Sequence, residues 1–123
     1  MTNKILFIFL VILSISAKSL SQEMTGKEIF LEKCSNCHNI KSEYTDNREL
    51  KAPPIDALTR QLKYYFRRKD EFINFVYKYV IEPSPENSVC LPCVNRWGVM
   101  PPQKDLKEEE IKSIALWMFM SFK

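Results

Sequence analysis

Histidine occurs once in the 123 residues, and no stretch alternates between polar and apolar residues at the period of two that is typical of a strand. The missing alternation argues against a sheet and predicts an all-α chain. The N-terminal apolar run, residues 5–13, is well below the about 20 residues needed to cross a bilayer. Basic residues exceed acidic ones by only 18 to 15, whereas a nucleic-acid-binding domain is usually strongly basic. The composition therefore gives no support for binding of nucleic acid.

The N-terminus has the three parts of a secretory signal peptide. Lys4 supplies the positive charge, the apolar run follows, and Ser19-Leu20-Ser21 offers small residues at the spacing that a signal peptidase recognises. We therefore expect residues 1–21 to be removed and residues 22–123 to form one exported, periplasmic domain. An uncleaved membrane anchor is the alternative. The polar residues that follow the apolar run argue against it.

The segment Cys34-Ser35-Asn36-Cys37-His38 has the C-x-x-C-H spacing of covalent haem attachment. Two thiols at this spacing can form thioether bonds to the two vinyl groups of one porphyrin, and His38 is then held against the iron as a ligand. Its other ring nitrogen is expected to donate to a carbonyl, because such bonds orient a metal-bound imidazole. Half of a zinc site is the alternative. Tetrahedral zinc needs four Cys or His ligands, and the second Cys pair lies far downstream.

Capping patterns predict where the first and last helices begin. Thr25 and Glu28 have the spacing of a capping box, in which each side chain accepts from the backbone N–H of the other residue. Asp105 is expected to cap the last helix, with Glu108 at its third position. The predicted buried face of that helix consists of Ile111, Ile114, Ala115, Met118 and Phe122.

Two further helices are predicted between these. One begins near Ile55 or Asp56 and runs towards Phe66. The other spans residues 70–80, where apolar residues recur with the helical period. The segment 82–102 has five prolines and no helical period, so we expect an ordered loop there.

Met100 is the candidate for the second iron ligand. Pro101 and Pro102 follow it directly and hold its backbone extended, which suits a ligand that must not move between oxidation states. Met118 and Met120 lie in the last predicted helix, where a methionine more often fills a gap in the core. Ligation by Met and His raises the reduction potential and leaves no open position for oxygen, so it favours electron transfer over catalysis.

Over nearly its whole mature length the chain resembles the class I c-type cytochromes, and among them the small bacterial monohaem carriers of the cytochrome c-551 kind. Gly26 and Phe30, followed by the C-x-x-C-H segment, match the first helix of that family in order. Trp117 falls at the aromatic position of the last helix that packs against the first. The resemblance implies a small cytochrome c fold, in which four to five helices wrap around one covalently bound haem c.

The resemblance also implies further haem contacts. Ala52-Pro53-Pro54-Ile55 is similar to the family segment whose proline carbonyl accepts from the haem histidine, with Ala52 where the family has glycine. Pro53 would then be the partner of His38. The segment from Trp97 to Met100 is similar to the methionine loop of the family. This similarity implies Met100 as the distal ligand and Trp97 as a contact to a haem propionate.

Cys90-Leu91-Pro92-Cys93 departs from the family pattern. Val94 follows this pair where a haem site would have His, so the pair is not a second haem site. Export and an even number of cysteines favour a disulfide. A redox dithiol is the alternative, because a C-x-x-C pair can have lowered thiol pKa values and can exchange.

The function implied is that of a periplasmic monohaem cytochrome c, a one-electron carrier between larger redox proteins and not an enzyme. A haem-based sensor of a small ligand, and a haem subunit of a larger oxidoreductase or peroxidase system, are the alternatives. No stable membrane insertion is expected once the signal peptide is removed. A dense basic run can be either a solvated helix face or a contact for an acidic redox partner. It consists of Arg60, Lys63, Arg67, Arg68 and Lys69.

Overall fold

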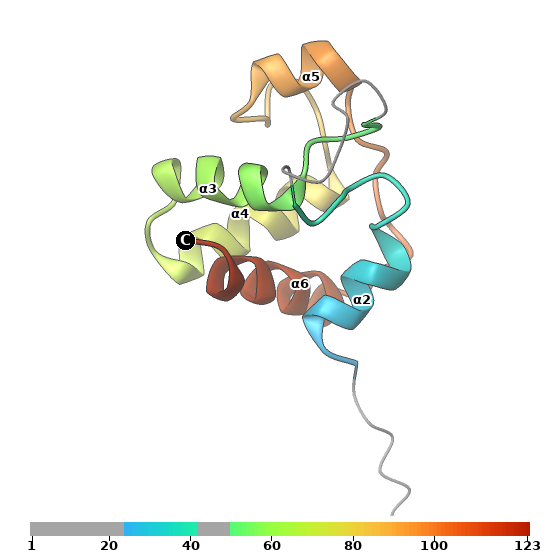
Figure 1. The fold of residues 1–123 in the computed structure, drawn as a ribbon, viewed down its shortest axis with the longest axis vertical. Coiled ribbons are helices and arrows are strands. Elements are labelled where there is room, and N and C mark those ends of the chain that lie inside the picture. The colour runs from blue at the N-terminus through green and yellow to red at the C-terminus, as the bar shows by residue number, and fades with distance from the viewer. Residues whose placement is uncertain (1–23, 42–49) are drawn as a thin grey trace, which may run out of the picture.

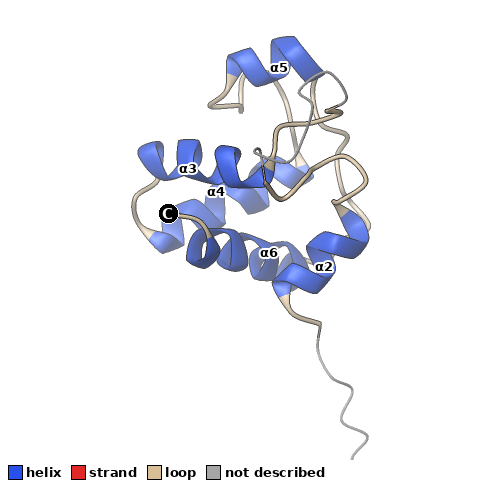
Figure 2. Ribbon diagram, in the orientation of Figure 1, coloured by secondary structure: helices blue, strands red, loops and turns tan. Residues whose placement is uncertain are grey.

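The computed structural model describes residues 24–41 and 50–123, so the predicted signal peptide, residues 1–21, and the start of the mature domain lie outside the described residues. Within these two ranges the chain is helical and has no strand, which confirms the predicted all-α class (Figure 2). The helices are α2 (Gly26–Lys33), α3 (Ile55–Tyr65), α4 (Lys69–Ile81), α5 (Leu91–Trp97) and α6 (Glu108–Ser121). None of them is long and apolar enough to span a membrane.

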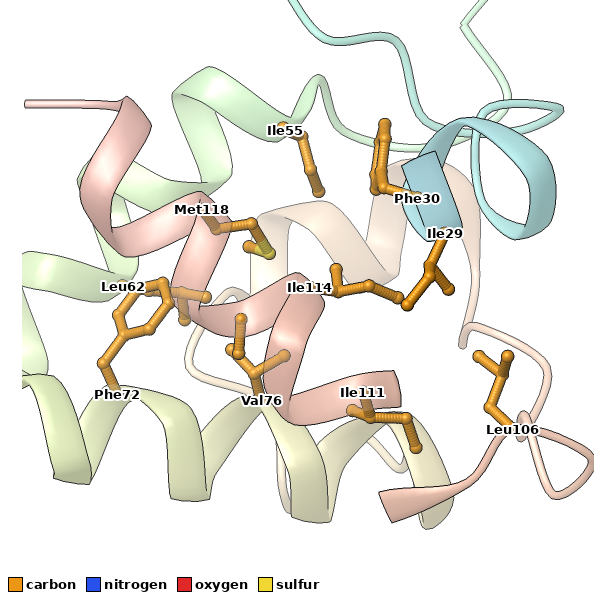
Figure 3. Close-up of a cluster of buried hydrophobic side chains, with 11 residues drawn as sticks. Ile29, Phe30, Ile55, Leu62, Phe72, Val76, Leu106, Ile111, Ile114 and Met118 are labelled. Carbon is orange, nitrogen blue, oxygen red and sulfur yellow. The ribbon is translucent and has the colours of Figure 1, made fainter. Parts of the chain in front are cut away.

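Helix α6 holds the other long helices together. It packs against α4, α2 and α3, while α5 lies apart from this group (Figure 1). Its buried residues are Ile111, Ile114, Ala115 and Met118, as predicted, and Phe122 packs against the same core with partial exposure. Figure 3 shows Ile111, Ile114 and Met118 of α6 in one cluster with side chains of the other helices. Phe72 and Val76 come from α4, and Ile29 and Phe30 come from α2.

The start of α2 and its contact with α6 follow from local sequence. The hydroxyl of Thr25 accepts from the backbone N–H of Glu28, and the Glu28 carboxylate accepts from the N–H of Thr25 at 2.9 Å. This confirms the capping box. One turn further on, the rings of Phe30 and Trp117 pack with their centroids 5.0 Å apart, as the resemblance implies.

Gly26 sits where α2 and α6 cross. A Cβ atom built on Gly26 would lie 2.0 Å from the carbonyl oxygen of Ser113, which belongs to the α6 backbone. No side chain can rotate away to relieve this contact. The backbone of α2 therefore approaches α6 more closely than any other residue type at this position would allow.

Helix α5 was not predicted, because its segment was expected to be a loop. The proline in it, Pro92, falls in the first turn, where its missing N–H costs no helical hydrogen bond. Gly98 follows the last helical residue with φ of 81°, a conformation that favours glycine. Proline near the start and glycine after the end are the signals that could have indicated this helix.

The predicted N-cap of the last helix, Asp105, is wrong. Helix α6 begins at Glu108, and Lys107 is its N-cap. The Glu110 carboxylate accepts from the backbone N–H of Lys107 at 3.1 Å, so the third glutamate in the run, not the first, occupies the position that reaches back. Leu106, which precedes the cap, is buried and fixes where the chain turns into the helix.

Gly26→Ala should lower the free energy of unfolding by about 2 kcal/mol, because the added methyl group forces α2 and α6 apart. Without that contact, a change from glycine to alanine in a helix would stabilise the protein. Denaturant unfolding measures the effect. The exposed neighbour provides the control: Lys27→Ala should change stability by less than about 0.5 kcal/mol. A stabilising Gly26→Ala would contradict the close crossing.

Candidate functional site

A large apolar cavity lies between α5 and the other helices. Its walls come from the end of α2, from α3, α4 and α6, and from the segment that contains α5. The space that no protein atom fills amounts to about 1220 Å³, with the open mouth included. All residues singled out from the sequence line this one cavity, although they are far apart in the chain: Cys34, Cys37, His38, Pro53, Cys90, Cys93, Trp97 and Met100.

The two thiols of the C-x-x-C-H segment stand on a turn that continues α2. The backbone N–H of Cys34 donates to the carbonyl of Phe30, and that of His38 donates to the carbonyl of Cys34 at 3.0 Å. Both cysteines are free thiols, with Cys34 partly buried and Cys37 exposed. Burial, and to a smaller extent the nearby Cys37, raises the pKa of the Cys34 thiol to about 11. Cys34 is therefore a neutral thiol at neutral pH.

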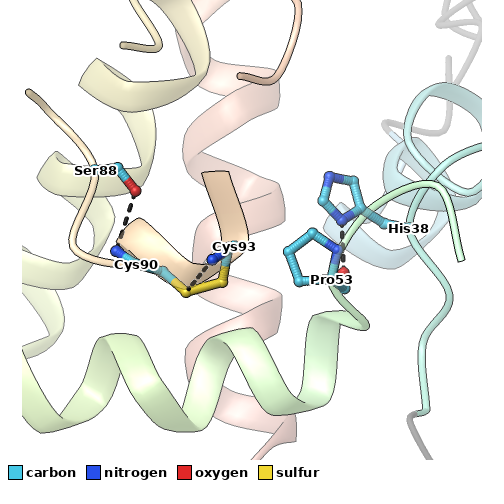
Figure 4. The surroundings of a disulfide bond; sticks show 5 residues. All are labelled: His38, Pro53, Ser88, Cys90 and Cys93. Carbon is cyan, nitrogen blue, oxygen red and sulfur yellow. Dashed lines mark hydrogen bonds between the residues drawn. A yellow bond between two sulfur atoms is a disulfide. The ribbon is translucent and has the colours of Figure 1, made fainter. Parts of the chain in front are cut away.

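His38 is held by the hydrogen bond that was expected for it. Its Nδ1–H donates to the carbonyl oxygen of Pro53 at 2.8 Å (Figure 4). This bond places the proton on Nδ1 and leaves the lone pair on Nε2, the nitrogen available to a metal. Burial lowers the pKa of His38 from its usual value, and the bond to Pro53 opposes this effect only in part. The imidazole is thus neutral at neutral pH, the form that binds a metal.

Backbone hydrogen bonds fix Pro53 opposite His38. The N–H of Ile55 donates to the carbonyl of Asn39 at 2.7 Å, and the N–H of Asp56 donates to that of Ile40 at 3.0 Å. These bonds tie the two residues after His38 to the first turn of α3. They also use N–H groups that a helix start leaves without a helical partner.

Cys90 and Cys93 lie at disulfide distance in the opposite wall, with their Cα atoms 5.2 Å apart (Figure 4). The pair spans the first turn of α5, since Cys90 is its N-cap. The N–H of Cys90 donates to the hydroxyl of Ser88 at 3.1 Å, and the N–H of Cys93 donates to the sulfur of Cys90 at 3.2 Å. This geometry is that of a disulfide. Because a redox dithiol has the same geometry when oxidised, both alternatives given by the sequence fit it.

Met100 reaches the cavity from a segment that is fixed on both sides. Before it, the indole N–H of Trp97 donates to the carbonyl of Leu50 at 3.0 Å. After it, the backbone N–H of Gln103 donates to the carbonyl of Val80 at 3.0 Å. The contact of Trp97 to Leu50 was not foreseen, and nothing in the local sequence indicates it. The role of Trp97 towards a propionate stays a prediction.

The zinc alternative finds no support in the described part of the chain. Residues 24–41 and 50–123 contain no group of three or more His, Cys, Asp or Glu side chains placed to hold a metal ion. Two of the four cysteines are in addition paired with each other.

The basic run is largely engaged in contacts within the protein. Arg60 forms an ion pair with Asp56 at 3.3 Å, and Arg68 forms one with Asp70 at 2.9 Å. The Lys63 ammonium lies 4.5 Å from the centre of the Phe119 ring and donates to the carbonyl of Phe122. These contacts favour a solvated helix face over a continuous cationic surface.

An uncharacterized protein of Aquifex aeolicus (strain VF5) is 31% identical to this chain over 112 residues, which cover 80% of this chain and 74% of that protein. No family model matches the chain. No solved structure matches it either.

The peptide that contains Cys90 and Cys93 should remain unlabelled when the purified, unreduced protein is unfolded in denaturant with iodoacetamide. The physical reason is that disulfide sulfurs are not thiolates and do not alkylate. Peptide mass spectrometry reads the result, with a sample reduced beforehand as the control in which both cysteines carry label. Two labelled cysteines in the unreduced sample would show that the pair is a dithiol.

Proposed function

The chain belongs to one family with the uncharacterized protein of Aquifex aeolicus, and we propose that it is a periplasmic monohaem c-type cytochrome, a one-electron carrier between larger redox proteins. One observation carries this proposal. The free thiols Cys34 and Cys37, the neutral His38 and the thioether of Met100 all line the same apolar cavity. A haem c carrier with His and Met ligands needs these groups around a single cofactor, and the C-x-x-C-H spacing is that of haem c attachment.

The cavity suits a group that is apolar over most of its surface and acidic at one edge. Among the residues that the structure describes, its lining includes a single charged side chain, that of Lys51, and this residue is exposed. Lys51 can therefore pair with a carboxylate at the mouth, while the apolar walls exclude water from the interior. Haem has this distribution, with its propionates on one edge of the ring. A domain of about 100 residues has a thin core of its own, and a buried cofactor adds apolar volume to it.

Each predicted site residue then has a defined task. Cys34 and Cys37 would hold the porphyrin through thioether bonds, and Nε2 of His38 and the sulfur of Met100 would bind the iron. Pro53 keeps the imidazole oriented and raises its basicity through the bond to Nδ1. Bound haem c supplies the one-electron couple, whereas these residues orient it and shield it.

With His38 and Met100 both bound, the haem iron would have no free position for a substrate. This is the reason to propose a carrier and not an enzyme. The predicted signal peptide and the disulfide support a periplasmic location. A sensor of a small ligand is the second candidate. It is favoured by one observation, namely that Met100 stands on the segment of α5, the helix that packs least against the others.

Intact mass of the secreted protein tests the proposal. We expect a chain without residues 1–21 that carries one haem and keeps it through acid–acetone extraction, because thioether bonds survive that treatment. The matched control is Cys34→Ser/Cys37→Ser, which should lose any bound haem in the same extraction. A parent protein that gives up its haem, or never contains it, would be fatal to the proposal.

Met100→Ala should remove the weak absorption band of thioether bound to ferric iron and allow the ferrous form to bind carbon monoxide. Met118→Ala is the comparison. Met118 is only 3% exposed, so its truncation should lower the free energy of unfolding by about 2–4 kcal/mol and leave the absorption band in place. Loss of the band in Met118→Ala but not in Met100→Ala would reverse the assignment of the distal ligand.

A further inference from the structure

The two halves of the Cys90–Cys93 disulfide differ in accessibility. Cys90 is buried, with 5% of its surface exposed, whereas Cys93 is partly exposed. Cys93 is therefore the half of the disulfide that a thiolate from outside reaches more easily. Thiol–disulfide exchange depends on which sulfur is accessible and on how readily the other leaves.

The sulfur of Cys90 already has a hydrogen-bond donor that would stabilise it as the leaving thiolate. When the bond to Cys93 breaks, negative charge develops on this sulfur, which accepts a hydrogen bond from the backbone N–H of Cys93 at 3.2 Å. A hydrogen bond to the charged form favours that form. The N–H of Cys90 is held by the Ser88 hydroxyl, so the buried half stays in place during the exchange.

From these observations we propose that Cys90–Cys93 is a site of thiol–disulfide exchange, opened by a dithiol reductant that attacks Cys93, and that its reduction loosens the Met100 segment. In the first step a thiolate of the reductant forms a mixed disulfide with Cys93 and expels Cys90 as a thiolate. In the second step the other thiol of the reductant attacks its own sulfur in the mixed disulfide and releases Cys93. Overall two electrons and two protons pass to the protein, which ends with two thiols, and the reductant becomes a disulfide.

The link between the disulfide and Met100 follows from the contacts that hold the α5 segment in place. Helix α5 packs only weakly against the other helices, in contrast to the group around α6. The bond of Trp97 to Leu50 and the bond of Gln103 to Val80 tie the segment to the rest of the protein, on either side of Met100. The disulfide closes the first turn of α5 on itself and so stabilises the short helix that ends at Trp97. Reduction removes this cross-link from α5, and its effect reaches Met100 through the helix. This regulatory part rests on the proposed haem site, whereas the exchange itself does not.

The exchange is tested on the secreted protein with dithiothreitol as the dithiol, followed by iodoacetamide and peptide mass spectrometry. We expect the native pair to be reduced within about tenfold of its rate in concentrated guanidinium chloride, because attack at an accessible Cys93 requires no unfolding. A native rate slower than that overturns the exchange site. The peptide with Cys34 and Cys37 is scored separately, so a missing haem is recognised there and is not confused with a failed exchange.

Single variants test which sulfur is attacked. Cys90→Ser leaves a free thiol at Cys93, and Cys93→Ser leaves one at Cys90. With an aromatic disulfide reagent, the thiol in Cys90→Ser should react at least about tenfold faster than that in Cys93→Ser, because it is the accessible one. Equal rates, or faster reaction of Cys90, would overturn attack at Cys93.

Carbon monoxide binding tests the effect on Met100, with the iron kept ferrous in all samples. Reduction of the disulfide should speed binding by at least about tenfold, as expected if a restrained segment must open for the ligand to enter. Cys90→Ser/Cys93→Ser is the control, which should bind at the faster rate with or without dithiothreitol. Unchanged binding in a protein whose disulfide has been reduced refutes the regulation and leaves the proposed carrier function standing.

Discussion

The approach of α2 to α6 at Gly26 is the contact on which the site depends. Because the two backbones are in contact there, a shift of one helix along the other is opposed. One turn further along α2, Phe30 therefore packs against Trp117 at a defined position along α6. Cys34 lies one turn beyond Phe30, on the same face of the helix. The position of the thiols in the cavity is thus set by a glycine two turns away. The same crossing fixes the turn that presents His38 towards Pro53.

The cavity consequently has two kinds of wall. One wall belongs to the packed group of α2, α3, α4 and α6, whose side chains form the core and leave little freedom to move. The other wall is the α5 segment, which has a disulfide across its own first turn and is tied to the rest of the protein by a few hydrogen bonds. His38 stands on the first wall and Met100 on the second. A ligand bound by both would therefore also join the weakly packed wall to the closely packed one, so the stability of α5 and occupation of the site are coupled.

Local patterns predicted the parts of the fold that are decided locally. The capping box of Thr25 and the buried stripe of α6 depend on residues within one or two turns, and both are present. The start of α6 was misplaced because three consecutive glutamates allow several registers, and the burial of Leu106, a tertiary contact, chooses among them. The bond of Trp97 to Leu50 joins residues 47 positions apart and leaves no trace in the local sequence. For the site, the C-x-x-C-H segment and the proline-flanked Met100 could be identified because each is a short motif. That these two motifs line one cavity cannot be read from either of them, because it depends on how the helices between and after them in the sequence pack together.

The lining of the cavity indicates how it would select its ligand. In the described part of the chain every fully buried side-chain nitrogen and oxygen already has a hydrogen-bond partner. On the cavity wall, Nε2 of His38 keeps a free lone pair. His38 is neutral, Cys34 is a neutral thiol, and the one charged lining residue, Lys51, is exposed. Apolar walls alone discriminate weakly between ligands of similar size, since one methylene group is worth about 1–3 kcal/mol. If the cavity holds haem, as proposed, selection would come from bonds that only certain ligands can form: thioethers to Cys34 and Cys37, and coordination by His38 and Met100. Specificity of this kind would depend on four side chains, while the apolar lining around them accepts many ligands of similar size. It would therefore not require the cavity to have its ligand-bound shape before the ligand is attached.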